Sequence, residues 1–174
     1  MGEELMARFR SLCAAHQDRV FTYARYLLGS AEDAEDVTQE VLVRLWDRGR
    51  GIAPEGLPAW LTRVTRNACL DLLRQRHWRP AHETDVDAEL VEDPAPGPAA
   101  QTEAAEMHRQ LQAGLQRLPE VQRSIVVLRE IEGLAYEEIA RALELPLNTV
   151  KVYLHRGRAQ LRQELQRMRE DEFC

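Results

Sequence analysis

Residues 81–102 restrict the fold of this chain more than any other segment. The segment holds six carboxylates and no Lys or Arg, and Pro94, Pro96 and Pro98 stand close together within it. Such a sequence has no apolar face for a helix to bury, and its prolines cannot complete a strand ladder. We therefore interpret it as a flexible acidic linker between two folded parts, residues 1–80 and residues 103–174. Each part is small but within the size range that folds alone.

Apolar side chains in the first part recur at intervals of three and four residues, which is the spacing of one buried helix face. Three such stripes cover residues 5–27, 34–45 and 61–72. Gly29 ends the first stripe, Ser30 is a typical N-cap before the second, and a loop rich in Gly and Pro, residues 49–58, precedes the third. Aromatic residues make up only 6% of the chain, a composition more typical of helices than of strands. The first part is therefore predicted to be a bundle of helices.

The second part contains two helix-forming stretches that a short break separates. Earlier stripes stop at Pro119 and at Gly133. Residues 136–143 then form a short stripe, Glu144, Leu145 and Pro146 interrupt it, and a longer stripe begins at residue 147. Two helices joined by a tight turn are typical of the helix-turn-helix. The predicted fold class is all-α, with two small helical domains joined by the flexible acidic linker.

The longer helix of this pair presents a mixed outward face. At 100° per residue, Val150, Leu154 and Leu161 face one side. Asn148, Val152, His155 and Ala159 lie on the opposite side, flanked by Lys151 and Arg156. Asn and Lys can hydrogen-bond to base edges, a small apolar residue can contact a thymine methyl group, and Arg can reach phosphate or guanine. We predict that this helix reads the major groove of DNA; the alternative is an ordinary helical corner whose Arg-rich helix is only solvated.

The net charge of −6 argues weakly against a nucleic-acid partner, because phosphate binding needs a positive surface. The charge is, however, unevenly distributed. Residues 60–80 hold five Arg and one Asp, a local charge of +4, and residues 141–169 hold seven basic residues and two Glu, a local charge of +5. Two basic segments are therefore candidates for DNA binding.

Three groups of motifs follow one another along the chain. The first is DAEDVTQEV at residues 33–41, the second is WLTRVTRN at residues 60–67 with DLLR at residues 71–74, and the third is LAYEEIA at residues 134–140 with NTVK at residues 148–151 and LHR at residues 154–156. In this order and spacing they resemble the extracytoplasmic-function (ECF, group IV) sigma factors of bacterial RNA polymerase. The resemblance implies that residues 1–80 are sigma region 2, that residues 103–174 are sigma region 4, and that the chain directs core polymerase to promoters and initiates transcription.

The resemblance also implies roles for particular residues. Asp36, Gln39 and Glu40 are expected to dock on the clamp helices of the polymerase β′ subunit, although such an acidic run can also be a solvated face. Opening a duplex costs base stacking, which a protein offsets by holding unstacked bases and contacting their phosphates with Arg. Four residues are expected to melt and bind the minus-ten promoter element: Arg63, Arg66, Asn67 and Arg74. Seven are expected to bind the minus-thirty-five element: Asn148, Thr149, Lys151, Val152, His155, Arg156 and Arg158.

The implied partners are core RNA polymerase, through its β′ clamp helices and β flap, and promoter DNA, with an anti-sigma factor as a further candidate. No cofactor, bound metal or enzymatic activity is expected, because the chain lacks a catalytic triad, a Gly-rich phosphate loop and a complete zinc motif. The longest aliphatic run, residues 125–128, is far too short to span a membrane, and the acidic N-terminus is unlike a signal peptide. We therefore expect a cytoplasmic protein that does not insert into membranes.

Two departures from the family pattern fall in the helix-turn-helix. Glu144 stands where Gly is usual in the turn, so either a non-Gly residue adopts a positive φ, at a cost of about 1 kcal/mol, or the turn has another shape. Val152 and Tyr153 replace a Ser-Arg pair that is common after the Lys. The second departure affects which bases are read and not whether DNA is bound.

Other functions fit parts of the sequence. A stand-alone helix-turn-helix regulator would use the first part to sense a signal or to dimerise, and a sigma-mimicking adaptor would occupy a sigma factor's partner without touching DNA. A metal-dependent sensor could use Cys13 and His16, which are three residues apart, but no motif supplies the remaining ligands. Trp60 starts an apolar stripe, and we interpret it as a core residue rather than as a platform for a base.

Overall fold

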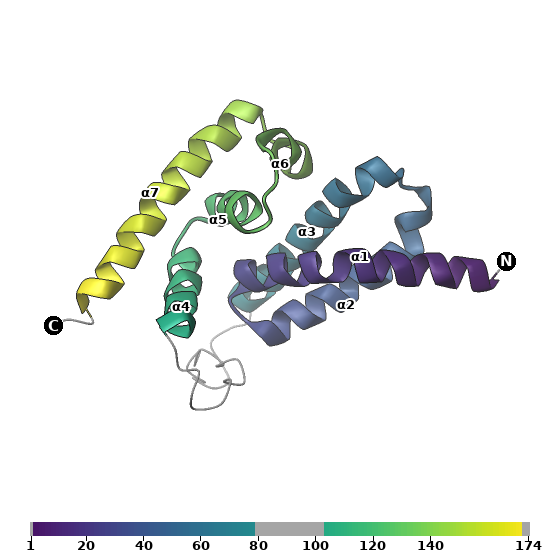
Figure 1. Cartoon of the computed structure of the whole chain (residues 1–174), viewed down its shortest axis with the longest axis horizontal. Helices are drawn as coiled ribbons and strands as arrows, with labels where there is room; N and C mark the ends of the chain where they lie inside the picture. The colour runs from purple at the N-terminus through teal and green to yellow at the C-terminus, as the bar shows by residue number, and fades with distance from the viewer. Residues whose placement is uncertain (1, 79–102, 172–174) are drawn as a thin grey trace.

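The computed structural model describes residues 2–78 and 103–171, so the predicted linker at residues 81–102 lies outside the described residues. Within the described residues the chain forms helices and no strand, which confirms the all-α prediction (Figure 1). The elements are α1 (Gly2–Leu28), α2 (Ala31–Arg48), the short η1 (Gly49–Gly51) and η2 (Pro54–Gly56), α3 (Leu57–Trp78), α4 (Glu103–Gln116), α5 (Glu120–Val126), the π-helical turn η3 (Val127–Ile131), α6 (Tyr136–Leu143) and α7 (Leu147–Asp171).

The first unit consists of α1, α2 and α3, which form the predicted helical bundle. α1 ends before Gly29, whose φ of 77° is a left-handed conformation that favours Gly. The Ser30 side chain then accepts a hydrogen bond from the Asp33 backbone N–H at 3.2 Å, which confirms Ser30 as the N-cap of α2. The core of this unit contains Val20, Tyr23, Leu27, Ala34, Val37, Val41, Leu45, Leu61 and Ala68. Trp60 packs against this core, as predicted.

The second unit consists of α4, α5, η3, α6 and α7, and it contains the predicted helix-turn-helix in α6 and α7. Glu144 takes a φ of 56° in the turn, so the first of the two predicted turn shapes is correct. The Leu145 backbone N–H donates to the Ala140 carbonyl at 3.0 Å and closes the end of α6. α7 crosses α5 at Gly157, where an added Cβ atom would lie 2.7 Å from a methyl carbon of Val126. The absence of a side chain at Gly157 therefore allows the two helices to approach closely.

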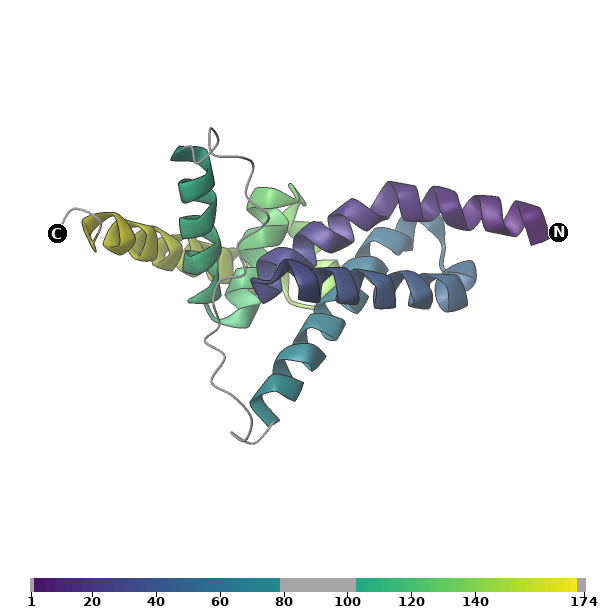
Figure 2. The ribbon, with the colours of Figure 1, turned by 90° about the horizontal axis from the view of Figure 1, so that it is seen from below.

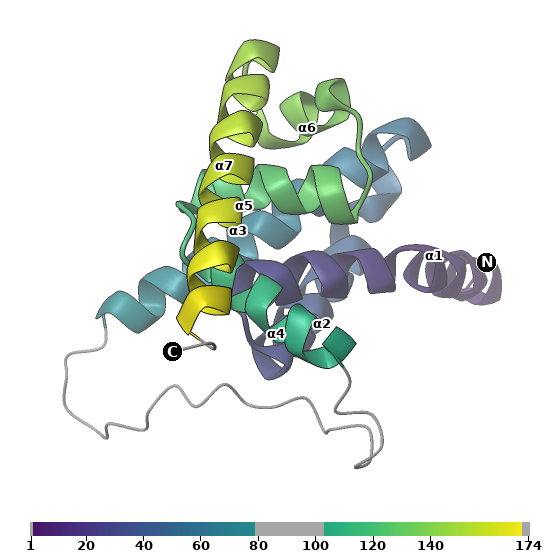
Figure 3. The same cartoon turned by 60° about the vertical axis from the view of Figure 1, so that its left-hand side comes forward.

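The two units pack against each other and share one hydrophobic core. α5 and η3 lie between α7 and the helices of the first unit (Figures 1 and 3). α4 lies beside the C-terminal end of α1, which Figure 2 shows from below. Tyr23 and Leu27 of α1 belong to the same buried cluster as Leu115, Ile125 and Leu128 of the second unit. The sequence pattern does not specify how the two units pack. This packing determines which of the predicted site residues are accessible.

Candidate polymerase and promoter interfaces

The predicted polymerase-docking residues form an exposed face on α2. Asp36, Gln39 and Glu40 are exposed, whereas Val37 and Val41 on the other side of the helix are buried. Glu40 forms an ion pair with Arg44 one turn further along the same helix. The structure thus brings the three docking candidates together on one surface, away from the core.

Val43 extends this exposed face of α2, and the sequence analysis did not identify it. It follows Gln39 by four residues and Glu40 by three, so the three side chains lie on one side of α2. Its side chain is 60% exposed, unusually high for an aliphatic residue between two buried positions, Val41 and Leu45. Val43 does not belong to the buried stripe of α2, and that mismatch is the sequence signal that could have identified it.

The predicted minus-ten residues of α3 fall into two groups. Asn67 and Arg74 are exposed, and Arg74 contacts Asp71 of the same helix at 3.3 Å. Arg63 and Arg66 are instead half-buried and contact the second unit. Because Arg63 and Arg66 both contact the second unit, DNA that binds their guanidinium groups would have to displace those contacts.

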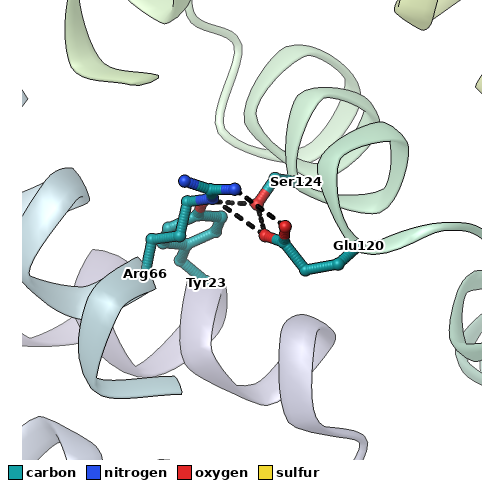
Figure 4. Close-up of polar contacts among 4 residues, drawn as sticks. All are labelled: Tyr23, Arg66, Glu120 and Ser124. Carbon is teal, nitrogen blue, oxygen red and sulfur yellow. Dashed lines mark hydrogen bonds and ion pairs between the residues drawn. The ribbon is translucent and has the colours of Figure 1, made fainter. Parts of the chain in front are cut away.

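The contacts of Arg66 form a small polar cluster between the units (Figure 4). Its Nε and Nη2 atoms donate to the two carboxylate oxygens of Glu120 at 2.8 and 2.7 Å. The Ser124 hydroxyl donates to Glu120 at 3.3 Å. Because a hydroxyl has one proton to donate, the Tyr23 hydroxyl must donate to Ser124 Oγ, 2.8 Å away. Every member of the cluster is thereby partnered, two from the first unit and two from the second.

Burial and polar contacts shift the pKa values of Tyr23 and Arg66 in opposite directions. Burial raises the pKa of Tyr23, and the hydrogen bond with Ser124 opposes that rise. Partial burial acts to lower the pKa of Arg66, but the hydrogen bonds and charge of Glu120 outweigh it, so the pKa is raised overall. Tyr23 is therefore neutral and Arg66 is charged at any physiological pH.

The outward face of α7 has the composition predicted for a DNA-reading helix. Val150 and Leu154 are buried, which fixes the orientation of the helix. Val152 is 40% exposed and Thr149 is half-buried. The remaining predicted residues on this part of α7 are exposed: Asn148, Lys151, His155 and Arg156. Arg158 is also exposed, but its Nε atom donates to Glu130 of η3 at 2.8 Å. Arg158 therefore lies toward η3, and its charge already has a partner.

The cysteines and histidines give no sign of a metal site in the described part of the chain. Cys13 and His16 are half-buried on α1, and no group of three potential ligands occurs among the residues that the structure describes. Cys69 of α3 is fully buried, and burial raises the pKa of its thiol to about 12. Over the same residues, no helix combines the length and hydropathy needed to cross a bilayer.

Family models and relatives agree with this geometry. Residues 12–79 match the Sigma-70 region 2 family and residues 108–161 match the Sigma-70 region 4 family. The chain is 38% identical to the ECF RNA polymerase sigma factor SigE of Mycolicibacterium smegmatis over 160 residues, which cover 92% of the chain and 62% of that protein. It is 37% identical to the RNA polymerase sigma-E factor of Streptomyces avermitilis, covering 95% of the chain and 88% of the relative.

Solved structures show the same fold. The sigma factor RpoE of Bartonella quintana, solved with the anti-sigma factor NepR, aligns with a TM-score of 0.72 at 23% identity, over 91% of this chain and 97% of that one. CnrH, solved with the cytosolic domain of CnrY, aligns with a TM-score of 0.69 at 24% identity, over 92% and 89% of the two chains. The two sigma-region matches and the SigE and sigma-E relatives show that the chain belongs to the extracytoplasmic-function sigma factors, which direct bacterial RNA polymerase in transcription initiation.

Proposed function

We propose that the chain divides its contacts with the transcription machinery among three helices. α2 docks on the β′ clamp helices of core polymerase, α3 binds and opens the minus-ten element, and α7 reads the minus-thirty-five element. The observation that carries this proposal is the outward face of α7, where amide, ammonium, imidazole and guanidinium groups surround one exposed aliphatic residue, Val152. On this proposal the chain acts as an initiation factor and not as an enzyme, in the cytoplasm together with core polymerase.

The docking role of α2 is supported by the chemistry of its exposed face. Two carboxylates and an amide offer acceptors and negative charge to a basic partner helix, and Val43 adds apolar area beside them. Region 4 supplies the second contact, with the β flap. An anti-sigma factor is a further candidate partner, because the sigma factor RpoE was solved with the anti-sigma factor NepR, and CnrH was solved with the cytosolic domain of CnrY.

The DNA-reading role of α7 separates into anchoring and reading. Arg156 is exposed beside the reading face and has the reach and charge to contact phosphate. Val152 has no charge and can discriminate only by apolar contact, as with a thymine methyl group. Loss of Arg156 should therefore weaken binding to all sequences, whereas a change at Val152 should alter the preference at one base pair.

The test is holoenzyme binding to upstream elements that differ by single base pairs, measured at two salt concentrations. Arg156→Ala should weaken binding uniformly and reduce the salt slope by roughly one. Val152→Ser should change the preference at one base pair by about 1 kcal/mol with little change in salt dependence. Arg162→Ala, six residues further along α7, is the matched control. A uniform loss for Val152→Ser, or a sequence-dependent loss for Arg156→Ala, would refute this orientation of α7.

A further inference from the structure

Arg156 and Arg158 lie on different sides of α7, although the sequence predicts that both contact the minus-thirty-five element. From the turn of an α-helix, Arg156 is about 40° around the axis from the exposed Val152 and about 160° from the buried Leu154. Arg158 is about 120° from Val152 and only about 40° from Leu154. Arg156 therefore flanks the outward face of α7, whereas Arg158 flanks the buried face.

Glu130 holds the Arg158 side chain against η3. The Arg158 Nε atom donates to the Glu130 carboxylate at 2.8 Å, and the Nη2 atom donates to the same oxygen. Hydrogen bonding to Glu130 raises the pKa of Arg158, and the Tyr136 hydroxyl adds to this effect. A phosphate that replaced Glu130 would leave this carboxylate unpaired beside the DNA backbone, and the repulsion between the two negative groups opposes the exchange.

The residue before Glu130 contacts the other helix of the helix-turn-helix. The Arg129 Nη1 atom donates to the Leu134 backbone carbonyl at 2.8 Å. The guanidinium carbon of Arg129 also lies 4.9 Å from the centre of the Tyr136 ring, which is a cation–π contact. Tyr136 is the first residue of α6. Arg129 therefore ties η3 to the start of α6.

η3 thus contacts α6 and α7 through two consecutive side chains, Arg129 and Glu130. It is a π-helical turn, a rare conformation that is frequent at functional sites. The Glu132 backbone N–H donates to the Val127 carbonyl, five residues earlier, at 3.1 Å. Because Val127 and Leu128 are buried in the core, η3 is a fixed support for both helices.

We infer that Arg158 is a positioning residue for promoter reading and not a phosphate contact. Together with Glu130 it sets the angle between α7 and η3, and thereby places the outward face of α7 on the base edges. The inference rests on the proposed function in one respect, the assignment of α7 to the minus-thirty-five element. It adds a residue that acts on the DNA through the orientation of the helix.

The length of α7 makes its outward face sensitive to this angle. Asn148 precedes Arg158 by ten residues, which is about 15 Å along the helix axis. At that distance a tilt of about 4° moves Asn148 by about 1 Å, more than the range of heavy-atom distances in a hydrogen bond. Phosphate contacts carry no direct sequence information. Loss of the pair should therefore reduce the discrimination between upstream elements and leave the salt dependence of binding unchanged.

The test is holoenzyme binding to upstream elements that differ by single base pairs, measured at two salt concentrations. Arg158→Ala should reduce the discrimination, the ratio of the dissociation constants for two such elements, by roughly twofold to fivefold, which is what an exposed ion pair contributes. Its salt slope should equal that of the parent, whereas Arg156→Ala reduces the slope by roughly one. Arg158→Glu should also lose discrimination. Combining it with Glu130→Arg should restore the discrimination, because opposite charges again face each other.

Arg162→Glu, one turn further along α7, makes the same change in net charge at an exposed position and is the matched control for Arg158→Glu. Glu130→Gln should reproduce the effect of Arg158→Ala, and it replaces the charge reversals should either of them unfold the chain. A salt slope reduced by one for Arg158→Ala, or an exchanged pair that does not restore the discrimination, would overturn the positioning role. Parent holoenzyme that binds all upstream elements equally would instead overturn the assignment of α7, so the two failures are distinguishable.

Discussion

Glu144 allows the geometry of the helix-turn-helix to be tested, because its backbone strain and its charge can be removed separately. Among the described residues it is the only non-Gly residue with a positive φ, 56°. A Cβ atom in this left-handed conformation costs about 1 kcal/mol, which Gly does not incur. Its carboxylate lies 3.4 Å from Arg63, but the two side chains are 70% and 39% exposed. Such a solvated pair contributes between about 0 and 1 kcal/mol.

Glu144→Ala removes the carboxylate and keeps the Cβ atom, so it should lower the free energy of unfolding by less than about 1 kcal/mol. Glu144→Gly removes both and should be more stable than Glu144→Ala by about 1 kcal/mol, since Ala is unfavourable where φ is positive. For a chain of this length the difference corresponds to roughly 2–4 °C in Tm. The comparison between the two variants isolates the backbone, because neither carries the charge.

Urea denaturation of the full chain measures both free energies. The same pair of substitutions at Gln163, an exposed position inside α7, is the matched control. There the order should reverse, with Gly less stable than Ala by about 1 kcal/mol, because the residue has ordinary helical geometry. Equal stability of Glu144→Ala and Glu144→Gly, or the order seen at Gln163, would refute the left-handed turn.

Three further predictions follow from packing, charge and burial. Gly157→Ala should lower the free energy of unfolding by about 1 kcal/mol, because the clash with buried Val126 outweighs the gain in helix propensity; unchanged stability in urea would contradict the close crossing of α5 and α7. Asp36→Arg combined with Glu40→Arg should abolish binding to core polymerase without unfolding α2, because both side chains are exposed; parental affinity in a pull-down with core enzyme would refute the docking face. Cys69 should resist iodoacetamide at pH 8 in the folded chain while half-buried Cys13 reacts, because burial raises the Cys69 pKa to about 12; equal alkylation by mass spectrometry would contradict its burial.

The helix ends were predictable because each depends on a few neighbouring residues. Gly29 and Ser30 end one helix and cap the next through contacts within four residues, and Pro119 and Gly133 interrupt the chain equally locally. The exposed face of α7 was predictable for a related reason, since helical periodicity alone places Val150 and Leu154 opposite Asn148 and Val152. Only the choice between two turn shapes at Glu144 needed the structure.

The contacts between the units could not be predicted, because their partners are distant in sequence. Arg66 and Glu120 are separated by 54 residues, including the acidic segment, and no periodic pattern relates them. Arg123 is a further example. A cation within the sequence VQRSIVV is expected to be solvated, yet Arg123 is only 8% exposed. Burial lowers its pKa, and four hydrogen bonds to Leu27, Gln116 and Leu118 compensate by holding the charged form.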